Sequence, residues 1–266
     1  MDEFNLKGKC AIITGGADGL GLATAEMMAR QGARVLLVDI DRARLDAAVE
    51  RLIADGHDAS GRIADVSDEE QVRGYVEEAT NRFGRIDAFF NNAGILPRYY
   101  GPMWNVPVDD FDRVLAVNVR GVFLGLKHVL PVMMAQGGGA IVNTASMGAA
   151  GGIPGSTAYV ASKHAVIGLT KNAALEAASA KVRVNAVLPG NIVTKMAAGD
   201  PGATEANHQR LAAMIPAGYM GAPSDIGGAV CYLFSDAARY VTGIELPVDG
   251  GILAASYGNM FRIDRG

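Results

Sequence analysis

The feature that most constrains the fold of this chain is a repeated alternation between short apolar runs and longer segments with helical periodicity. Residues 10–14 (CAIIT) and 34–40 (RVLLVDI) are mostly apolar and rich in branched side chains, which is typical of parallel strands covered on both faces. Between them, residues 20–30 space their apolar side chains at helical intervals, and Gly32 follows. A strand, a tight turn, a helix and a second strand are therefore predicted at the start of the chain.

The same alternation continues to the far end of the sequence. Further strands are predicted at residues 60–66, 86–94, 139–146, 181–190 and 243–251, and helices at 41–56, 67–84, 109–136, 156–179 and 222–236. The helix at 67–84 is expected to begin with Ser67 as its cap, because acids follow it. No linker or shift in composition divides the chain, so one α/β domain over residues 1–266 is predicted, with a seven-stranded parallel sheet and helices on both faces. The irregular stretch at about 191–219 is expected to form a substrate lid.

Composition and charge argue against several classes of protein. Half of the residues are hydrophobic and the net charge is −4, which excludes a disordered chain and provides no basic surface for nucleic acid. The two cysteines, Cys10 and Cys231, lie far apart in apolar surroundings, which favours buried thiols and a reducing compartment. The N-terminus lacks the pattern of a secretory signal, and glycines and prolines interrupt the uncharged stretch 128–162. A cytoplasmic protein without a membrane span is predicted.

A glycine-rich turn joins the first predicted strand to the first helix. Residues 14–21 (TGGADGLG) place backbone N–H groups and a helix N-terminus where a pyrophosphate can bind. The glycine spacing differs from the G-x-G-x-x-G fingerprint, so this loop alone is equally compatible with a simple tight turn. Asp39 ends the second strand, where an acid can accept hydrogen bonds from an adenosine ribose, although a helix cap or an exposed loop acid is the alternative. Together the two features favour a dinucleotide site.

Tyr159 and Lys163 are four residues apart in a predicted helix and therefore share a face. A free tyrosine titrates near 10, and a pKa of about 7 requires ~4 kcal/mol of preferential stabilisation of the phenolate. A neighbouring ammonium and a positively charged nicotinamide can supply that stabilisation. A bare pair of this kind usually marks an exposed helix face, but Ser146 ends the fifth predicted strand, where doubly wound sheets present functional side chains.

These motifs together resemble those of the short-chain dehydrogenase/reductase family, and the resemblance covers essentially the whole chain. It is carried by TGGADGLG at 14–21, Asp39, Asp65-Val66, NNAG at 91–94, Asn118, Ser146, Tyr159, Lys163, Pro189-Gly190 and Thr194. The resemblance implies a Rossmann fold and an oxidoreductase in which Tyr159 is the general acid/base and Ser146 polarises and orients the reacting oxygen. It further implies that Lys163 holds the nicotinamide ribose and lowers the pKa of Tyr159, and that Asn118 keeps a water in a proton relay.

The resemblance also implies which residues hold the cofactor, NAD(H). They are Gly15, Asp18, Gly19, Leu20, Gly21, Asp39, Ile40, Asp65, Val66, Asn91, Ala93, Gly94, Tyr159, Lys163, Pro189, Gly190, Ile192 and Thr194. Asp65 is expected to meet the adenine and Asn91 the adenosine side, whereas Ile192 and Thr194 are expected to bind the carboxamide. Asp39 and Asp18 favour NAD over NADP, because two acids would repel a 2′-phosphate. The four histidines lack metal-ligand spacing, so no metal is expected.

Three predicted loop segments flank Ser146 and Tyr159, and their inward residues are expected to be apolar. The expected pocket residues are Ser146, Met147, Tyr159, Ile95, Ile153, Met196 and Met214. Because no basic side chain is obviously placed to hold a carboxylate or phosphate, the predicted substrate is a neutral secondary alcohol or ketone with a cyclic or aryl body. Segments beside the motifs resemble those of bacterial levodione-type and cyclic-diol dehydrogenases, and the family resemblance implies a homotetramer.

Two alternatives to this interpretation stay open. One is an NADPH-dependent 3-oxoacyl or carbonyl reductase of the same family, against which the two acids argue. The other is a catalytically silent dinucleotide-sensing module, which would have no need of Asn118, Ser146, Tyr159 and Lys163 together.

Overall fold

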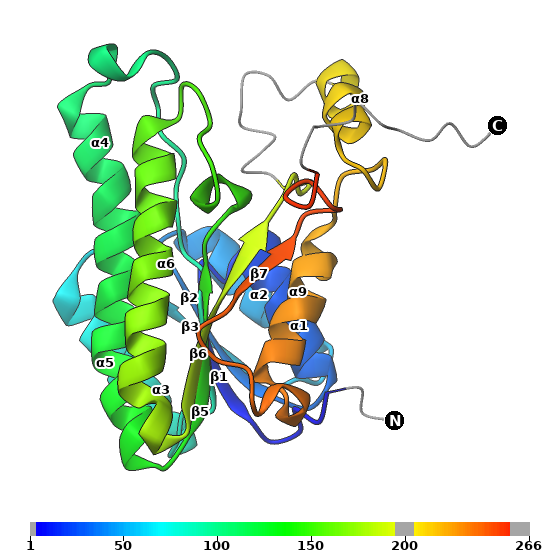
Figure 1. Cartoon of the computed structure of the whole chain (residues 1–266). Coiled ribbons are helices and arrows are strands. Elements are labelled where there is room, and N and C mark those ends of the chain that lie inside the picture. The colour runs from blue at the N-terminus through cyan, green and yellow to red at the C-terminus, as the bar shows by residue number, and fades with distance from the viewer. Residues whose placement is uncertain (1–3, 195–204, 256–266) are drawn as a thin grey trace.

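The computed structural model describes residues 4–194 and 205–255, and it confirms the predicted seven-stranded parallel sheet (Figure 1). The strands are β1 (Cys10–Thr14), β2 (Arg34–Asp39), β3 (Ala59–Ile63), β4 (Ala88–Asn91), β5 (Gly139–Thr144), β6 (Val182–Pro189) and β7 (Glu245–Val248). Their order in the sheet is β3-β2-β1-β4-β5-β6-β7, and every pair is parallel. The chain crosses from β3 at one edge to β4 beside β1. Ligands of doubly wound sheets bind at the carboxyl ends of the strands, next to such a reversal.

Several strands end earlier than predicted, because their last residues leave the sheet to build loops. The fourth strand shows the cause most clearly. After Asn91, the N–H groups of Asn92 and Ala93 donate to the Thr14 hydroxyl at 2.9 and 3.1 Å. The Thr14 hydroxyl thus accepts hydrogen bonds that would otherwise go to the main chain of the neighbouring strand, and the strand pairing of β4 ends there.

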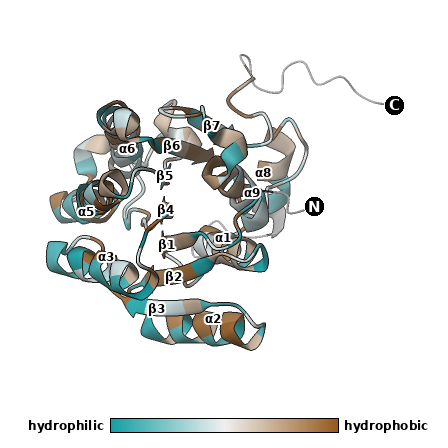
Figure 2. Ribbon diagram, turned by 90° about the horizontal axis from the view of Figure 1, so that it is seen from below, coloured by the Kyte–Doolittle hydropathy of each residue, from teal (hydrophilic) through white to brown (hydrophobic). Residues whose placement is uncertain are grey.

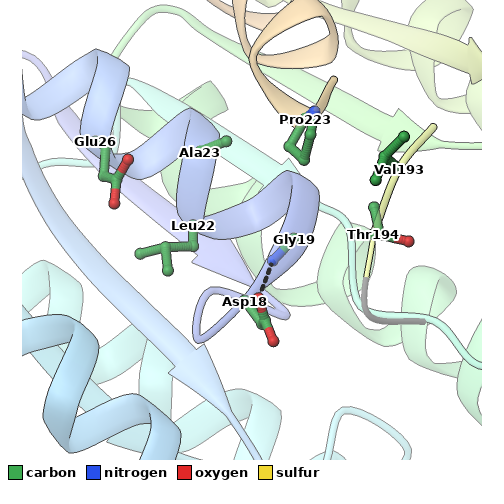
Figure 3. A pocket seen from close by; sticks show the side chains of 8 residues that line it. All are labelled: Asp18, Gly19, Leu22, Ala23, Glu26, Val193, Thr194 and Pro223. Carbon is green, nitrogen blue, oxygen red and sulfur yellow. Dashed lines mark hydrogen bonds between the residues drawn. The ribbon is translucent and has the colours of Figure 1, made fainter. Parts of the chain in front are cut away.

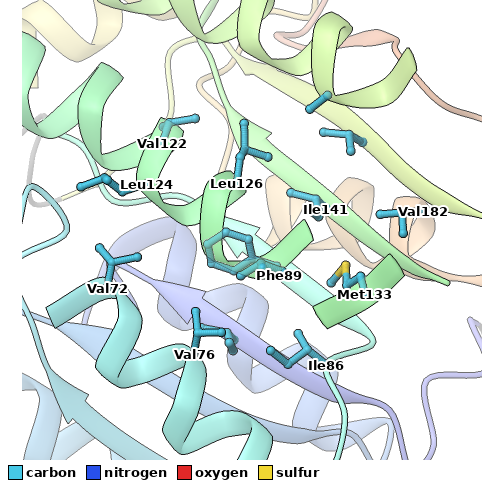
Figure 4. Close-up of a cluster of buried hydrophobic side chains, with 14 of the residues drawn as sticks. Val72, Val76, Ile86, Phe89, Val122, Leu124, Leu126, Met133, Ile141 and Val182 are labelled. Atoms are coloured by element: carbon cyan, nitrogen blue, oxygen red, sulfur yellow. The ribbon is translucent and has the colours of Figure 1, made fainter. Parts of the chain in front are cut away.

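Helices cover both faces of the sheet, as predicted (Figure 2). They are α1 (Gly19–Arg30), α2 (Arg42–Ala54), α3 (Glu69–Phe83), α4 (Val108–Leu115), α5 (Gly121–Ala135), α6 (Thr157–Ala177), α8 (Glu205–Met214) and α9 (Pro223–Phe234). Side chains that alternate along a strand point to opposite faces, so Ile12 packs with α3, α5 and α6, whereas Ile13 packs with α1, α2 and α9. In the first of these two cores, Phe89 of β4 lies between side chains of α3 and α5 (Figure 4).

The segment predicted as one helix at 109–136 consists of three pieces. Between α4 and α5, residues Ala116–Arg120 form a π-helical turn that holds the buried side chain of Asn118. A π turn widens the helix by one residue and commonly marks a functional site. By length and composition Val108–Ala135 could cross a membrane, but in this structure Val122, Leu126 and Met133 belong to the core beside the sheet.

Two local expectations need correction or completion. Ser67 is not the cap of α3: Asp68 accepts from the Gln71 N–H at 3.2 Å, and the Ser67 hydroxyl donates to Asp65 instead. A carboxylate one residue nearer the helix is the better acceptor for its N-terminal N–H groups. The predicted lid at 191–219 is described only in part, because residues 195–204 lie outside the described residues. Within this stretch, residues 205–214, which were predicted to be irregular, form helix α8.

Candidate active site

The loop between β1 and α1 is shaped so that a ligand could approach its backbone. Gly15 and Gly19 have φ of +63° and +55°, which side-chain-bearing residues rarely adopt. A Cβ at Gly21 would lie 2.1 Å from the Gly15 carbonyl oxygen, so only glycine permits this turn. Asp18 caps α1 by accepting from the Gly19 N–H at 2.8 Å (Figure 3). The structure therefore brings the predicted glycines together at a helix N-terminus.

Asp39 lies at the end of β2, beside this loop. One carboxylate oxygen accepts from the Ala17 N–H and the other from the Asp41 N–H, both at 3.1 Å. Each oxygen keeps a further lone pair, because a carboxylate can accept about four hydrogen bonds. Arg44, for which no role was predicted from the sequence, pairs with Asp41 at 3.2 Å and with Asp18 at 3.7 Å. Three acids therefore gather beside this loop, and Arg44 pairs with two of them.

A pocket of about 410 Å³ opens at the N-terminus of α1 (Figure 3). It is lined by Asp18, Gly19, Leu22, Ala23, Glu26, Val193, Thr194 and Pro223. The segment after β6 reaches it because Ile192 pairs with Gly221 in an isolated parallel bridge. A Cβ on Gly19 would be 3.9 Å from the Thr194 methyl, so the predicted carboxamide-binding residue lies against the predicted phosphate loop.

Ser146, Tyr159 and Lys163 meet at the carboxyl end of β5. Ser146 is 7% exposed, and its hydroxyl accepts from the Gly148 N–H at 3.1 Å and hydrogen-bonds the Tyr159 phenol. Lys163 is buried and donates to the Thr144 carbonyl at 2.7 Å. Its Nζ lies 5.6 Å from the centroid of the Tyr159 ring. Tyr159 and Lys163 thus lie on the same face of α6, as predicted, and this face is directed towards Ser146.

Burial dominates the electrostatics of Tyr159 and Lys163. Burial raises the pKa of Tyr159, and the hydrogen bond from Ser146 only partly opposes that rise. Burial also lowers the pKa of Lys163 to about 8. In the protein without its cofactor, desolvation therefore disfavours the Tyr159 phenolate. The expected lowering of the Tyr159 pKa relies on Lys163 together with the positive charge of an oxidised nicotinamide, and it stays a prediction.

Asn118 is completely buried, and its side chain joins the loop after β4 to helix α6. Its Oδ1 accepts from the Ile95 N–H at 2.8 Å, and its Nδ2 donates to the Ile95 carbonyl at 3.0 Å. The same Nδ2 donates to the Ser162 hydroxyl at 3.1 Å, and that hydroxyl donates to the Tyr159 carbonyl at 2.7 Å. Asn118 thus fixes the loop after β4 against the helix that carries Tyr159. Its predicted water stays a prediction.

Other predicted cofactor residues have structural partners of their own. The Asn91 side chain is buried and its Nδ2 donates to the Val122 carbonyl at 2.9 Å, which holds β4 against α5, whereas its contact with the adenosine side stays a prediction. Asp65 accepts from the N–H and hydroxyl of Ser67 at 2.8 and 2.7 Å. Ile40 is 68% exposed at the end of β2. Gly190 follows β6, and its N–H donates to the Val248 carbonyl at 3.0 Å.

Asn92 is a residue of the site that sequence reasoning left without a role. Its Nδ2 donates to the Thr14 carbonyl at 3.0 Å, and its Oδ1 accepts from the Thr144 hydroxyl at 3.0 Å. It therefore ties together the carboxyl ends of β1, β4 and β5. The NNAG motif was the available signal, but its partners become adjacent only once the strand order is known.

The predicted apolar pocket residues are only partly buried, and their contact with a substrate stays a prediction. Ile95 is half-buried beside Asn118, and Met147 and Ile153 are half-buried close to Ser146, with the Ile153 side chain against Gly148. Met214 is 60% exposed, whereas its neighbour Ile215 is buried and packs against Gly250. Met214 is the last residue of α8, and Ile215 follows it. Met196 lies outside the described residues. Among residues 4–194 and 205–255, no three His, Cys, Asp or Glu side chains gather as a metal site requires.

Known proteins resemble this chain over most of its length. A family profile described as enoyl-(acyl carrier protein) reductase matches residues 15–253. The levodione reductase of Leifsonia aquatica is 42% identical over 254 residues, which cover 93% of this chain and 95% of that protein. The cyclohexanol dehydrogenase of Acinetobacter sp. (strain SE19) is 38% identical over 249 residues, covering 94% of this chain and 96% of the relative.

Solved structures show the same similarity in three dimensions. The crystal structure of levodione reductase superposes with a TM-score of 0.90 at 41% identity, covering 94% of this chain and 99% of the other. NAD⁺-bound xylitol dehydrogenase superposes with a TM-score of 0.86 at 36% identity, covering 92% and 99%. The similarity extends through the sheet and through the elements that carry the site.

Proposed function

The chain belongs to the short-chain dehydrogenase/reductase family, and from that premise we propose that it uses NAD(H) to interconvert a neutral, hydrophobic secondary alcohol and its ketone. The observation that carries this proposal is the meeting of Ser146, Tyr159 and Lys163 at the carboxyl end of β5. It combines a proton-transfer group, a donor for the reacting oxygen and a buried cation in one place.

The residues of the β1–α1 loop fit a dinucleotide. The two positive-φ glycines and the forbidden Cβ at Gly21 leave backbone exposed at the N-terminus of α1, where phosphates bind well. Asp39 is held with lone pairs available for ribose hydroxyls. Lys163, buried close to Gly94, would hold the nicotinamide ribose. When bound, the cofactor gives or accepts the hydride.

The protein's own groups would manage the proton and the substrate oxygen. Tyr159 moves a proton at its phenolic oxygen, and Ser146 Oγ, oriented by the Gly148 N–H, donates to the substrate oxygen. The Lys163 ammonium stabilises the phenolate form, together with the positive charge of the oxidised nicotinamide. The Asn118 side chain holds the loop that begins at Ile95 against the helix of Tyr159. The water that Asn118 is expected to keep would complete the proton relay from Lys163.

A preference for NAD over NADP is supported by the charges at the adenosine end. Asp18, Asp39 and Asp41 lie around the β1–α1 loop and the end of β2, and Arg44 pairs with Asp18 and Asp41 but not with Asp39 in the described structure. A 2′-phosphate beside Asp39 would be repelled. The bound NAD⁺ in the similar xylitol dehydrogenase agrees with this preference.

A neutral, cyclic substrate is supported by the apolar side chains near Ser146 and by the relatives. Ile95, Met147 and Ile153 offer hydrocarbon surface. Cyclohexanol, the substrate in the name of one relative, is a neutral cyclic secondary alcohol. We further infer a single catalytic domain over residues 1–266 that works as a cytoplasmic homotetramer. Exposed apolar side chains on two helices, Phe123 at 47% and Leu175 at 80%, support self-association.

The decisive experiment is a screen for NADH formation with neutral secondary alcohols, polyols, hydroxy acids and sterols. We expect turnover with NAD⁺ and a neutral alicyclic or aryl alcohol. A best substrate among carboxylates or sugars would contradict the apolar pocket, whereas exclusive use of NADPH with 3-oxoacyl thioesters would favour the alternative reductase. Absence of turnover despite measurable NADH binding would favour the sensing module. Light scattering of the purified protein tests the tetramer.

A further inference from the structure

The segment 95–101, which follows β4, lies against two other parts of the site. At its start, Ile95 is held by the side chain of Asn118. At its end, the Gly101 N–H donates to the Gly155 carbonyl at 3.2 Å. Gly155 is four residues before Tyr159 in the chain, and Ile153, two residues earlier, contacts Gly148. The segment is therefore tied at its start, through Asn118 and Ser162, to the helix of Tyr159, and at its end to the turn that precedes this helix.

A carboxylate of α4 anchors the middle of this segment. Asp110 is 7% exposed, and its Oδ2 accepts from the N–H groups of Arg98 and Tyr99 at 2.8 and 2.9 Å. Burial alone would raise the pKa of Asp110, but these hydrogen bonds and Arg113 outweigh it, so the pKa is lowered. The position of Asp110 in the first turn of α4 also favours a negative charge. The carboxylate is thus permanently ionised near neutral pH.

Arg113, one turn further along α4, completes the anchor. Its Nε and Nη2 donate to Asp110 Oδ1 at 3.2 and 2.7 Å. The same Nη2 donates to the Leu96 carbonyl at 2.9 Å. Asn118, Asp110 and Arg113 therefore bind the backbone of residues 95, 96, 98 and 99 from one continuous helical segment. That segment packs against α6, which carries Tyr159 (Figure 1).

This degree of attachment is unusual for a loop, because loops beside a binding site are commonly mobile. The ion pair of Asp110 and Arg113 makes no contact with Ser146, Tyr159 or Lys163 in the described structure. Its bonds end on the main chain of the segment. The arrangement fixes the position of that main chain, and with it the half-buried side chains of Ile95 and Tyr99.

We propose that Asp110 and Arg113 are positioning residues that hold segment 95–101 as a fixed wall of the substrate pocket and thereby set which alcohols and ketones are turned over. This inference rests on the proposed function and deepens it. A fixed wall contacts the body of a bulky substrate but not a small one. Loosening the wall therefore lowers kcat/KM for bulky substrates selectively and leaves cofactor binding intact.

The test compares Asp110→Asn with a matched control, Asp87→Asn. Asp87 also accepts from a backbone N–H, that of Cys10 at 2.9 Å, and pairs with Arg85, but it lies at the amino end of the sheet. Cyclohexanol and propan-2-ol serve as probe substrates with NAD⁺. For Asp110→Asn we expect kcat/KM for cyclohexanol to fall about tenfold relative to that for propan-2-ol, with KM for NAD⁺ changed less than about twofold. Asp87→Asn should leave the ratio unchanged. Equal losses with both alcohols, or the same change in the control, would overturn the inference.

Two further measurements keep the test decisive. Arg113→Lys retains the charge but cannot bond both Asp110 and the Leu96 carbonyl in the same geometry, so it should shift the ratio in the same direction if Asp110→Asn does not fold. Hydrogen exchange at the Arg98 and Tyr99 amides needs no turnover. These amides should exchange slowly in the wild type and in Asp87→Asn, and fast in Asp110→Asn. Fast exchange in the wild type would refute the fixed wall. A wild type inactive with every alcohol would instead refute the proposed function, whatever the exchange shows.

Discussion

The side-chain nitrogen of Lys163 lies 5.6 Å from the centroid of the Tyr159 ring, inside the protein. The ammonium donates one hydrogen bond to the Thr144 carbonyl, which does not compensate for the hydration that it loses on burial. Burial therefore lowers the pKa of Lys163 to about 8, which means that its charge opposes folding. The cation that the proposed mechanism uses therefore lowers the stability of the folded protein.

Replacing this lysine should increase stability and abolish activity. In the unfolded chain Lys163 titrates near 10.4, so below pH 8 its burial costs ~3 kcal/mol, and the lost hydrogen bond offsets about 1 kcal/mol of the gain. Between pH 8 and about 10 the unfolded state binds more protons, so the wild type becomes more stable as the pH rises. We expect Lys163→Met to exceed the wild type in free energy of unfolding at pH 7, by urea titration, and the difference to shrink by pH 10. Lys127→Met, at a more exposed site, is the control, and a less stable Lys163→Met at pH 7 would disprove this account.

Tyr159→Phe should remove nearly all turnover while NADH still binds. The substitution deletes only the phenolic oxygen that hydrogen-bonds Ser146. A positioned acid/base contributes ~10²- to 10⁴-fold, so kcat should fall by at least about a hundredfold. Fluorescence titration should give a Kd for NADH within about threefold of the wild type, since less than 1 kcal/mol is at stake. Retention of more than about a tenth of kcat would exclude Tyr159 from this role.

Asp39→Ala should narrow the preference for NAD over NADP. The substitution removes the carboxylate beside the phosphate loop, which accepts hydrogen bonds from the N–H groups of Ala17 and Asp41. Removing it relieves repulsion of a 2′-phosphate and deletes acceptors for ribose hydroxyls, so kcat/KM should fall with NAD⁺ and rise with NADP⁺. Asp55→Ala, at the far end of α2, is the control. A wild type that works faster with NADP⁺ would end this interpretation.

Local sequence pattern predicted the elements of this fold well, and it failed where three-dimensional neighbours decide. The strand cores and the shared face of Tyr159 and Lys163 follow from periodicity, which is a property of adjacent residues. The π-helical turn at Ala116–Arg120 has no such signature, because one inserted residue leaves both flanking helical patterns intact. Asp110 and Arg113 have the spacing of an ordinary surface ion pair, and only the loop folded over them gives them another role.

The role of Asn92 could not be predicted from local pattern either, because its partners come from the strands on either side of β4. Its hydrogen bond from Thr144 can be tested by substitution. Thr144→Val removes the hydroxyl that donates to Asn92 Oδ1 but keeps the carbonyl that binds Lys163. An acceptor in a partly buried site then loses its donor, which costs about 1–3 kcal/mol of unfolding free energy.

The effect on function should separate cofactor binding from chemistry. Asn92 also donates to the Thr14 carbonyl at the start of the phosphate loop, so its release should raise KM for NAD⁺ more than it lowers kcat. Thr170→Val is the matched control: its hydroxyl accepts from Asn143 at 2.9 Å within the core behind the site. It should lose comparable stability in urea without a change in KM for NAD⁺. If both variants lose stability but neither alters KM, Asn92 stabilises the sheet and does not position the cofactor loop.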